Sequence, residues 1–246
     1  MNKEISLTFK KCKIEKRPAL LTYIVAGDYN KKKSSQILNS ISEHADIIEY
    51  GMPFNAATAD GPQIQNSSYR ALKSGIKLKD IFRIIKNYKK NKLSKPCILM
   101  GYYQTVFNFG EKNFIRECKR SKLSGCIIVD LPWPENKNFS KLCKKNNINL
   151  HLDGARLFNA IIATDTIPSD YGLIFDSISI CFSKGLGAPI GSLLLGSETF
   201  IKKARRIRKI FGGGMRQVGY LAAACDFAFD NNFKYLNEDH RRAKKN

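Results

Sequence analysis

The sequence predicts an α/β fold, because short apolar runs alternate with helical patterns along its first 150 residues. Runs rich in β-branched residues indicate buried strands, and apolar residues at helical spacing indicate the helices between them. The expected strands are residues 20–26, 46–50, 97–100, 126–131 and 148–152. The expected helices are residues 34–42, 79–88, 113–120 and 138–145. This order predicts parallel strands with right-handed crossovers, forming about four to five of the eight units of a (β/α) barrel.

Length and composition exclude several classes of protein. The 246 residues can form one large domain or two small ones, and 43% hydrophobic with 26% charged residues excludes a disordered or collagen-like chain. No apolar run reaches the roughly 18 residues of a membrane span, and the amino end lacks a signal-peptide core. The seven cysteines contain no Cys-x-x-Cys pair, which argues against a disulfide framework or a metal site. We therefore expect a cytoplasmic protein with no membrane partner.

The strong positive charge is the main argument for a nucleic-acid partner. Lys and Arg number 42 against 21 Asp and Glu, for a net charge of +21. In residues 1–150, however, lysine outnumbers arginine 23 to 5 and is scattered over the expected helix faces. Nucleic-acid sites favour clustered arginine and aromatic side chains, and neither cluster is present. We expect no nucleic-acid partner, and we expect the densest basic group, residues 202–209, to form an amphipathic helix.

Polar residues gather just after the expected strands. Glu49, Asp60, Tyr102 and Asp130 occupy these positions. The carboxyl ends of the strands are the edge at which a β/α barrel carries its chemistry. The sequence therefore predicts a site for a small-molecule substrate at this edge.

Residues 5–147, approximately, resemble the amino-terminal half of the tryptophan synthase alpha subunit, a TIM barrel, because five of its motifs occur here in order. They are residues 19–28 (ALLTYIVAGD), 45–54 (ADIIEYGMPF), 59–65 (ADGPQIQ), 99–103 (LMGYY) and 125–132 (GCIIVDLP). The resemblance implies retro-aldol cleavage of indole-3-glycerol phosphate to indole and glyceraldehyde 3-phosphate, in tryptophan biosynthesis and without a cofactor. It implies that Glu49 moves protons, that Asp60 holds the indole nitrogen and that Tyr102 shapes the indole pocket. The alternatives are loop-capping carboxylates and a tyrosine that only packs in the core.

Two departures from that family bear on function. Ala56 and Ala57 stand where the family usually has an acidic residue and a proline, in a loop that communicates with the beta subunit. We therefore expect that any association with a tryptophan synthase beta subunit is weakened. The family's later glycine-rich loops, which hold the substrate phosphate through backbone N–H groups, have no counterpart after residue 150, so we expect impaired activity.

The carboxyl-terminal part contains three different motifs: residues 151–160 (HLDGARLFNA), 176–192 (DSISICFSKGLGAPIGS) and 211–217 (FGGGMRQ). A strand-end aspartate can pair with a pyridinium nitrogen, and a lysine among small residues can attach pyridoxal phosphate. The motifs resemble the middle segment of low-specificity L-threonine aldolase, a pyridoxal-phosphate enzyme, over about residues 148–243. The resemblance implies that Lys184 attaches the cofactor, that Asp153 pairs with the ring nitrogen and that Arg156 and Arg216 lie at the cofactor. The alternatives are a surface lysine in a turn and, for Arg216, a residue at a helix start.

Together these patterns predict a chimera of two partial lyases. Residues 1–148 would form the partial tryptophan synthase alpha-like barrel, and residues 149–246 part of a pyridoxal-phosphate enzyme's large domain with a mixed or parallel sheet. The change in the Lys:Arg ratio across residue 150, from 23:5 to 7:7, agrees with such a joint. Cleavage of indole-3-glycerol phosphate is the first expected function, and cleavage of L-threonine or allo-threonine to glycine and acetaldehyde is the second. A non-catalytic relic or binding module is the third alternative, and a homo-oligomer is an expected assembly because aldolase sites lie at subunit interfaces.

Overall fold

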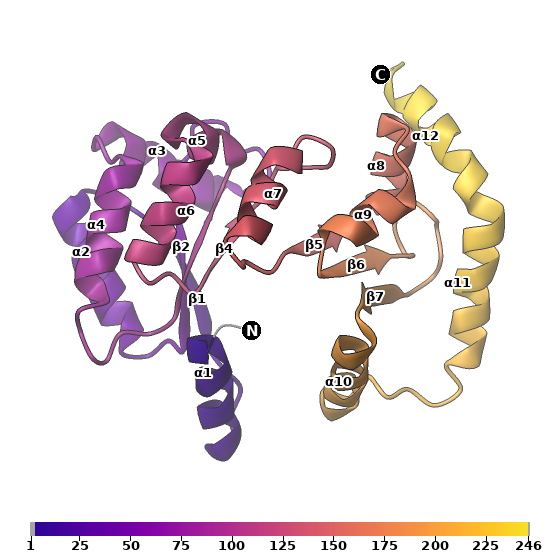
Figure 1. Ribbon diagram of the computed structural model, residues 1–246, viewed down its shortest axis with the longest axis horizontal. Coiled ribbons are helices and arrows are strands. Elements are labelled where there is room, and N and C mark those ends of the chain that lie inside the picture. The colour runs from indigo at the N-terminus through magenta and orange to yellow at the C-terminus, as the bar shows by residue number, and fades with distance from the viewer. Residues whose placement is uncertain (1–2, 246) are drawn as a thin grey trace. The chain divides into compact units, whose positions relative to one another are not determined.

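The computed structural model describes residues 3–245 and divides into two compact units (Figure 1). Unit 1 ends at Pro132 and unit 2 begins at Trp133. This division precedes the family boundary predicted at 148/149. Helix α7 (Lys137–Lys145) consequently belongs to unit 2.

Unit 1 is built on a four-stranded parallel sheet in the order β1-β2-β3-β4. Its strands are β1 (Leu21–Val25), β2 (Ile47–Gly51), β3 (Cys97–Gly101) and β4 (Gly125–Ile128). The α/β class and the parallel sheet predicted from the sequence are confirmed, with four strands of the expected barrel in this sheet. The fifth expected strand forms β5 (His151–Gly154) and pairs in the sheet of unit 2.

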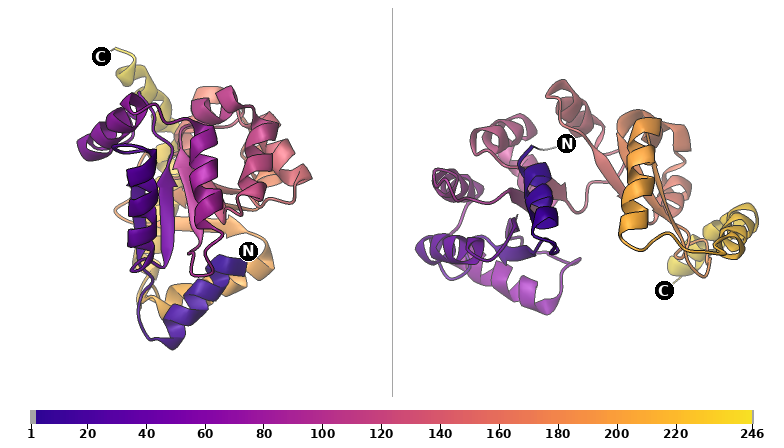
Figure 2. Two further views of the ribbon diagram at one scale, coloured as in Figure 1. Left: turned by 90° about the vertical axis from the view of Figure 1, so that its left-hand side faces the viewer. Right: turned by 90° about the horizontal axis from the view of Figure 1, so that it is seen from below.

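The helices of unit 1 connect these strands. They are α1 (Lys3–Ile14), α2 (Lys31–Ser42), α3 (Pro62–Lys73), α4 (Leu78–Tyr88), α5 (Tyr103–Phe109) and α6 (Glu111–Arg120). The Asn30 side chain caps α2 by accepting a hydrogen bond from the Lys33 N–H at 2.8 Å. The apolar face of α4 is buried, including Ile81 and Ile85, and α4 contacts both α2 and α6. Helices α2, α4 and α6 lie side by side along one face of the sheet, whereas α1 lies at the end from which the strands begin (Figure 2).

Strand alternation determines which side chains of β2 face the helices. Ile48 and Tyr50 are fully buried, and the Tyr50 hydroxyl lies 2.6 Å from Ser34 Oγ of α2. Successive side chains of a strand point to opposite faces of its sheet. Glu49 therefore points to the other face, the one that would line the interior of a barrel.

Unit 2 contains a three-stranded mixed sheet. β5 pairs in parallel with β6 (Ser177–Cys181), which pairs in antiparallel with β7 (Ser192–Gly196). The helices are α8 (Leu157–Thr164), α9 (Pro168–Ile174), α10 (Glu198–Ile210), α11 (Gly219–Asn232), the 3-10 helix η1 (Phe233–Tyr235) and α12 (Leu236–Ala243). The basic segment 202–209 lies within α10, so its predicted helix is confirmed. One core cluster gathers Trp133, Tyr171 and Ile178.

The described part of the chain contains neither a membrane-spanning helix nor a cluster of metal-ligating side chains. Over residues 3–245, no helix combines the length and apolar character needed to cross a bilayer. Within the same range, no three His, Cys, Asp or Glu side chains are grouped in a way that could hold a metal ion.

Candidate functional site

Glu49 occupies the middle of β2, between Tyr23 of β1 and Ile98 of β3. Its side chain is half-buried on the face opposite the helices. Gly51 lies on the same face, and a side chain there would collide with the Tyr23 hydroxyl. Glycine at position 51 therefore makes room for the Tyr23 ring beside Glu49.

Asp60 and Tyr102 are joined by a hydrogen bond. The Tyr102 hydroxyl donates to Asp60 Oδ2 at 3.1 Å and accepts from the Ala59 N–H at 3.0 Å. Tyr102 is buried and stacks on Phe54, with ring centroids 4.9 Å apart. The Gln65 amide of α3 donates to the Asp60 carbonyl at 2.8 Å, which ties this loop to the helix that follows it. Two of the predicted site residues, Asp60 and Tyr102, are thus in contact.

Tyr23 belongs to this group, although sequence reasoning gave it no role. The pKa of the Tyr23 hydroxyl is raised to about 12. Burial is the largest cause, and the negative charges of Asp60 and Glu49 also contribute. Nearby anionic groups disfavour a phenolate, so both carboxylates lie close enough to act on this ring. Tyr23 stands within the first quoted motif, and only the pairing of β1 with β2 reveals that it opposes Glu49.

Other contacts hold the loops at this edge of the sheet. Arg70 of α3 forms a bidentate pair with Asp28, with both nitrogen–oxygen distances at 2.7 Å, and keeps the pKa of Asp28 below its usual value. Asp130 accepts a hydrogen bond from the Tyr103 N–H at 2.6 Å, which fixes the start of α5. Asp130 therefore has a structural contact at the position where the sequence indicated a polar site residue.

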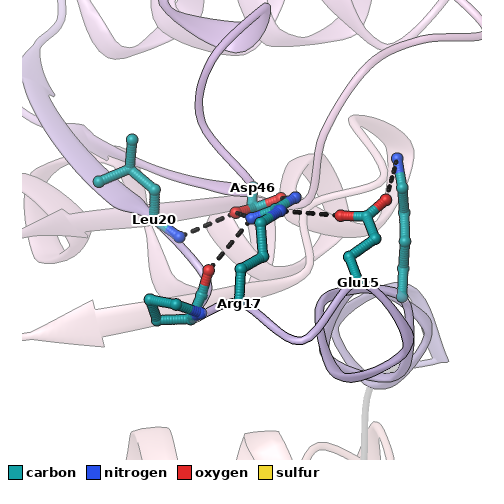
Figure 3. A network of polar contacts seen from close by, with 6 residues as sticks. Glu15, Arg17, Leu20 and Asp46 are labelled. Atoms are coloured by element: carbon teal, nitrogen blue, oxygen red, sulfur yellow. Dashed lines mark hydrogen bonds and ion pairs between the residues drawn. The ribbon is translucent and has the colours of Figure 1, made fainter.

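Asp46, immediately before β2, stabilises the opposite end of the sheet, at which the strands begin (Figure 3). Its carboxylate accepts from both terminal nitrogens of Arg17, at 2.6 and 2.8 Å, and from the Leu20 N–H at 2.8 Å. The hydrogen bonds from Arg17 are the largest cause that holds the pKa of Asp46 far below its usual range. This network fixes the entry of β1 and β2, and thereby the register that sets Tyr23 opposite Glu49.

In unit 2, Asp153 and Lys184 come from neighbouring parallel strands. Asp153 of β5 pairs with Ser179 of β6, and Lys184 follows the end of β6 by three residues. Parallel strands end at the same edge of a sheet, so both residues belong to that edge. The loop is anchored there by the Asn232 amide, which donates to the Leu186 carbonyl at 2.8 Å, and by the Gly187 N–H, which donates to the Lys184 carbonyl at 2.9 Å.

The two predicted arginines are not joined to that pair. Arg156 is exposed just before α8, and Arg216 is exposed in the segment before α11. Between residues 3 and 245, no hydrogen bond or ion pair connects either arginine with Asp153 or Lys184. Of the four predicted cofactor residues, Asp153 and Lys184 therefore share one end of the sheet, through the pairing of β5 with β6.

The chemistry of these side chains fits pyridoxal phosphate. An exposed amine can attach its aldehyde, and a carboxylate on the neighbouring strand can pair with its ring nitrogen. A cavity of about 590 Å³ in the same unit is lined instead by one face of the sheet, including Ile178, Leu193 and Leu195. That cavity is lined by neither Asp153 nor Lys184, so it is distinct from the candidate cofactor position.

Comparison with known proteins gives two families for the two parts of the chain. Residues 9–152 match the family described as tryptophan synthase alpha chain, and residues 130–246 match the family described as beta-eliminating lyase. The Pelagibacter ubique tryptophan synthase alpha chain is 61% identical, over 84% of this chain and 76% of its own length. The Candida albicans low-specificity L-threonine aldolase is 48% identical, over 50% of this chain and 32% of its own length.

Solved structures support the tryptophan synthase alpha fold for the amino-terminal part of the chain. The tryptophan synthase alpha subunit of Legionella pneumophila superposes with a TM-score of 0.57 at 30% identity, covering 65% of this chain and 63% of that one. The chain spans less than two thirds of the length of this structure and about a third of the aldolase. The predicted chimera is confirmed, since its parts match two enzyme families. Through residues 9–152 the chain belongs to the tryptophan synthase alpha chain family, and its carboxyl-terminal part is similar to pyridoxal-phosphate-dependent threonine aldolases.

Proposed function

We propose that unit 1 binds indole-3-glycerol phosphate and cleaves it slowly to indole and glyceraldehyde 3-phosphate. Glu49 transfers protons between the glycerol hydroxyl and the indole carbon, and Asp60 accepts a hydrogen bond from the indole nitrogen as charge develops there. Tyr102 orients Asp60. Two contacts support this proposal: the hydrogen bond of 3.1 Å between Tyr102 and Asp60, and the position of Tyr23 opposite Glu49 in the pairing of β1 with β2.

The geometry supports distinct roles for the two carboxylates. Asp60 already accepts a hydrogen bond from Tyr102 at 3.1 Å, so one oxygen is oriented while the other remains for a substrate donor. Glu49 lies on a central strand, where its backbone is fixed by pairing on both sides. A fixed base and an oriented acceptor match what a retro-aldol step requires, because one proton moves while positive charge forms on the indole ring.

We expect slow turnover because few groups in unit 1 can hold the substrate phosphate. The parallel sheet of the described chain has four strands, whereas a closed barrel has eight and holds phosphate at loops after its later strands. Weak phosphate binding reduces the binding energy that aligns the glycerol carbons with Glu49. The expected effect is a high KM together with a low kcat.

The test is indole release by the full chain, with Glu49→Gln as the variant. General acid–base catalysis typically contributes about 10²- to 10⁴-fold, so this neutral replacement should lower the rate by that factor or to the uncatalysed level. The matched control is Glu43→Gln, which removes the same charge from an exposed position at the end of α2. Equal rates for the wild type and Glu49→Gln would overturn the assignment of Glu49.

A second proposal concerns unit 2: Lys184 attaches pyridoxal phosphate and Asp153 pairs with its ring nitrogen, the arrangement that serves threonine cleavage in the aldolases. The parallel pairing of β5 with β6 supports it, because it puts both residues at one edge of the sheet. When bound, the cofactor supplies an electron sink for cleavage next to an amino-acid α-carbon. Arg156 and Arg216 are candidates for contacts with its phosphate.

Cofactor attachment can be measured without any turnover. Pyridoxal phosphate is titrated into the chain, the visible absorption band is recorded, and the adduct is fixed with borohydride and located by peptide mapping. We expect the adduct at Lys184, its loss in Lys184→Ala, and no loss in Lys203→Ala, a control at an exposed lysine of the same unit. Adducts spread evenly over surface lysines would contradict the proposal.

We also propose that any association with a tryptophan synthase beta subunit is weak. Solved relatives include a tryptophan synthase complex from Pyrococcus furiosus. In this chain Ala56 is exposed and Ala57 buried in the loop before Asp60, and neither methyl group can form a polar contact with a partner. Light scattering of the chain alone and mixed with a beta subunit measures this association, and it also tests the expected homo-oligomer.

A further inference from the structure

Two cysteines of unit 1 face each other across the packing of α6 on β4. Cys118 Sγ of α6 and Cys126 Sγ of β4 lie 3.6 Å apart. Cys126 is exposed and Cys118 is half-buried, so a small reagent can reach the pair. We call these two residues the α6–β4 dithiol.

The position of the pair follows from strand register and from the turn between the two elements. Cys126 pairs with the buried Leu99 of β3, so it points toward the helix-covered face of the sheet. The Leu123 N–H donates to the Cys118 carbonyl at 3.1 Å, and the Ser124 N–H donates to the Cys97 carbonyl at 2.8 Å. The turn is therefore already ordered, and little chain entropy is left to lose when the two sulfurs join.

The remaining movement is small. A disulfide bond is about 2.0 Å long, so the sulfurs must approach by roughly 1.5 Å, which side-chain rotation can supply. The surrounding segment also favours an anionic reagent, because residues 111–122 contain five basic and two acidic residues. Small disulfides of the glutathione type carry net negative charge and would be attracted there.

We propose that the α6–β4 dithiol is a reversible oxidation site that reacts with small-molecule disulfides. The thiolate of Cys126 attacks one sulfur of the reagent, which releases one thiolate and leaves a mixed disulfide on Cys126. The thiolate of Cys118 then attacks Cys126 Sγ and releases the second thiol. In total, two protein thiols and one small disulfide give one protein disulfide and two small thiols, so the protein is oxidised and the reagent is reduced.

A third cysteine close to the pair serves as an internal reference. Cys97 of β3 is fully buried, and burial raises the pKa of its thiol to about 12. The reactive species in disulfide exchange is the thiolate, so Cys97 should stay reduced while its neighbours exchange. Selective oxidation of the pair is therefore a specific expectation and differs from general oxidation of all seven cysteines.

The experiment incubates the full chain in mixtures of oxidised and reduced glutathione, blocks free thiols and maps tryptic peptides by mass spectrometry. Trypsin cleaves after Lys119, Arg120 and Lys122, which lie between the two cysteines. A disulfide would therefore join two separate peptides, with a combined mass lower by two hydrogens. We expect this linked species, and we expect added reductant to remove it.

Three variants make the outcome decisive. Cys126→Ser should abolish the linked peptides, and Cys118→Ser should instead accumulate the mixed disulfide on Cys126. Cys181→Ser, a control at a partly exposed cysteine of unit 2, should leave the linked peptides unchanged. A wild-type chain that gives only mixed disulfides, or that links other cysteines, would overturn the proposal.

Discussion

Replacing Asp46 with alanine is expected to destabilise unit 1 by about 2 kcal/mol. Asp46 is 5% exposed and accepts hydrogen bonds from both terminal nitrogens of Arg17 and from the Leu20 N–H, and the Cys12 thiol also hydrogen-bonds to it. The variant leaves the partly buried Leu20 N–H without its acceptor, at a cost of at most about 1–3 kcal/mol. The Arg17 side chain is 41% exposed, so water can replace the lost carboxylate, and its share of the loss is small.

The assay is urea unfolding followed by two signals. Far-UV circular dichroism reports both units, whereas the single tryptophan, Trp133, lies in unit 2. With a denaturant slope of about 1–3 kcal/mol per M, Asp46→Ala should move the unfolding midpoint of unit 1 down by roughly 1 M. The Trp133 fluorescence transition should not move. Glu15→Ala, which removes the other carboxylate paired with Arg17, is the control and should shift stability by less than about 0.5 kcal/mol.

The effect should depend on pH with a defined sign. The hydrogen bonds from Arg17 lower the pKa of Asp46 in the folded state relative to the unfolded value near 4. The contribution of Asp46 to the free energy of unfolding is therefore complete above about pH 5, and it is lost as the pH falls through the lowered folded-state pKa. The difference between the wild type and Asp46→Ala should shrink on acidification. An unchanged midpoint at neutral pH, or a difference independent of pH, would refute this reasoning.

Three further predictions concern the candidate site and its surroundings. In Glu49→Gln, spectroscopic titration should show the pKa of Tyr23 lowered from about 12, yet still above 10 because the ring stays buried. An unchanged pKa would show that the Glu49 charge does not act on Tyr23. Tyr102→Phe should lower kcat/KM for indole-3-glycerol phosphate by about 10- to 100-fold, because Asp60 loses a hydrogen bond of about 1.5–3 kcal/mol. Cys97 should resist alkylation near pH 8 until the chain unfolds, and its rapid labelling in the folded protein would contradict its burial.

The sequence predicted the strands of unit 1 well because each is a compact apolar run between polar segments. It missed α3, where the sequence Gln63-Ile-Gln-Asn-Ser-Ser offers few apolar positions, although Pro62 marks the first turn of that helix. Glu49 and Asp60 could be selected from motif context. The part played by Tyr23 could not, because it depends on which residue of β1 opposes Glu49 in the folded sheet.

The division between the units also depends on contacts distant in sequence. Trp133 packs edge-on against Tyr171, with ring centroids 6.3 Å apart, and this contact draws the segment before α7 into unit 2. A change in lysine and arginine usage contains no information about such a contact. Leu193, Leu194 and Leu195 of β7 are 39–50% exposed, a feature that their apolar sequence alone would not indicate.

The most direct test of the proposed function compares indole formation from indole-3-glycerol phosphate by the wild type and by Glu49→Gln, with Glu43→Gln as the control. We expect slow indole formation by the wild type and the control, well below the 1–10³ per second of typical enzymes. In Glu49→Gln we expect a fall of about 10²- to 10⁴-fold, or to the uncatalysed rate. Indole formation that is the same in all three proteins would contradict it, because Glu49 would then take no part in the reaction.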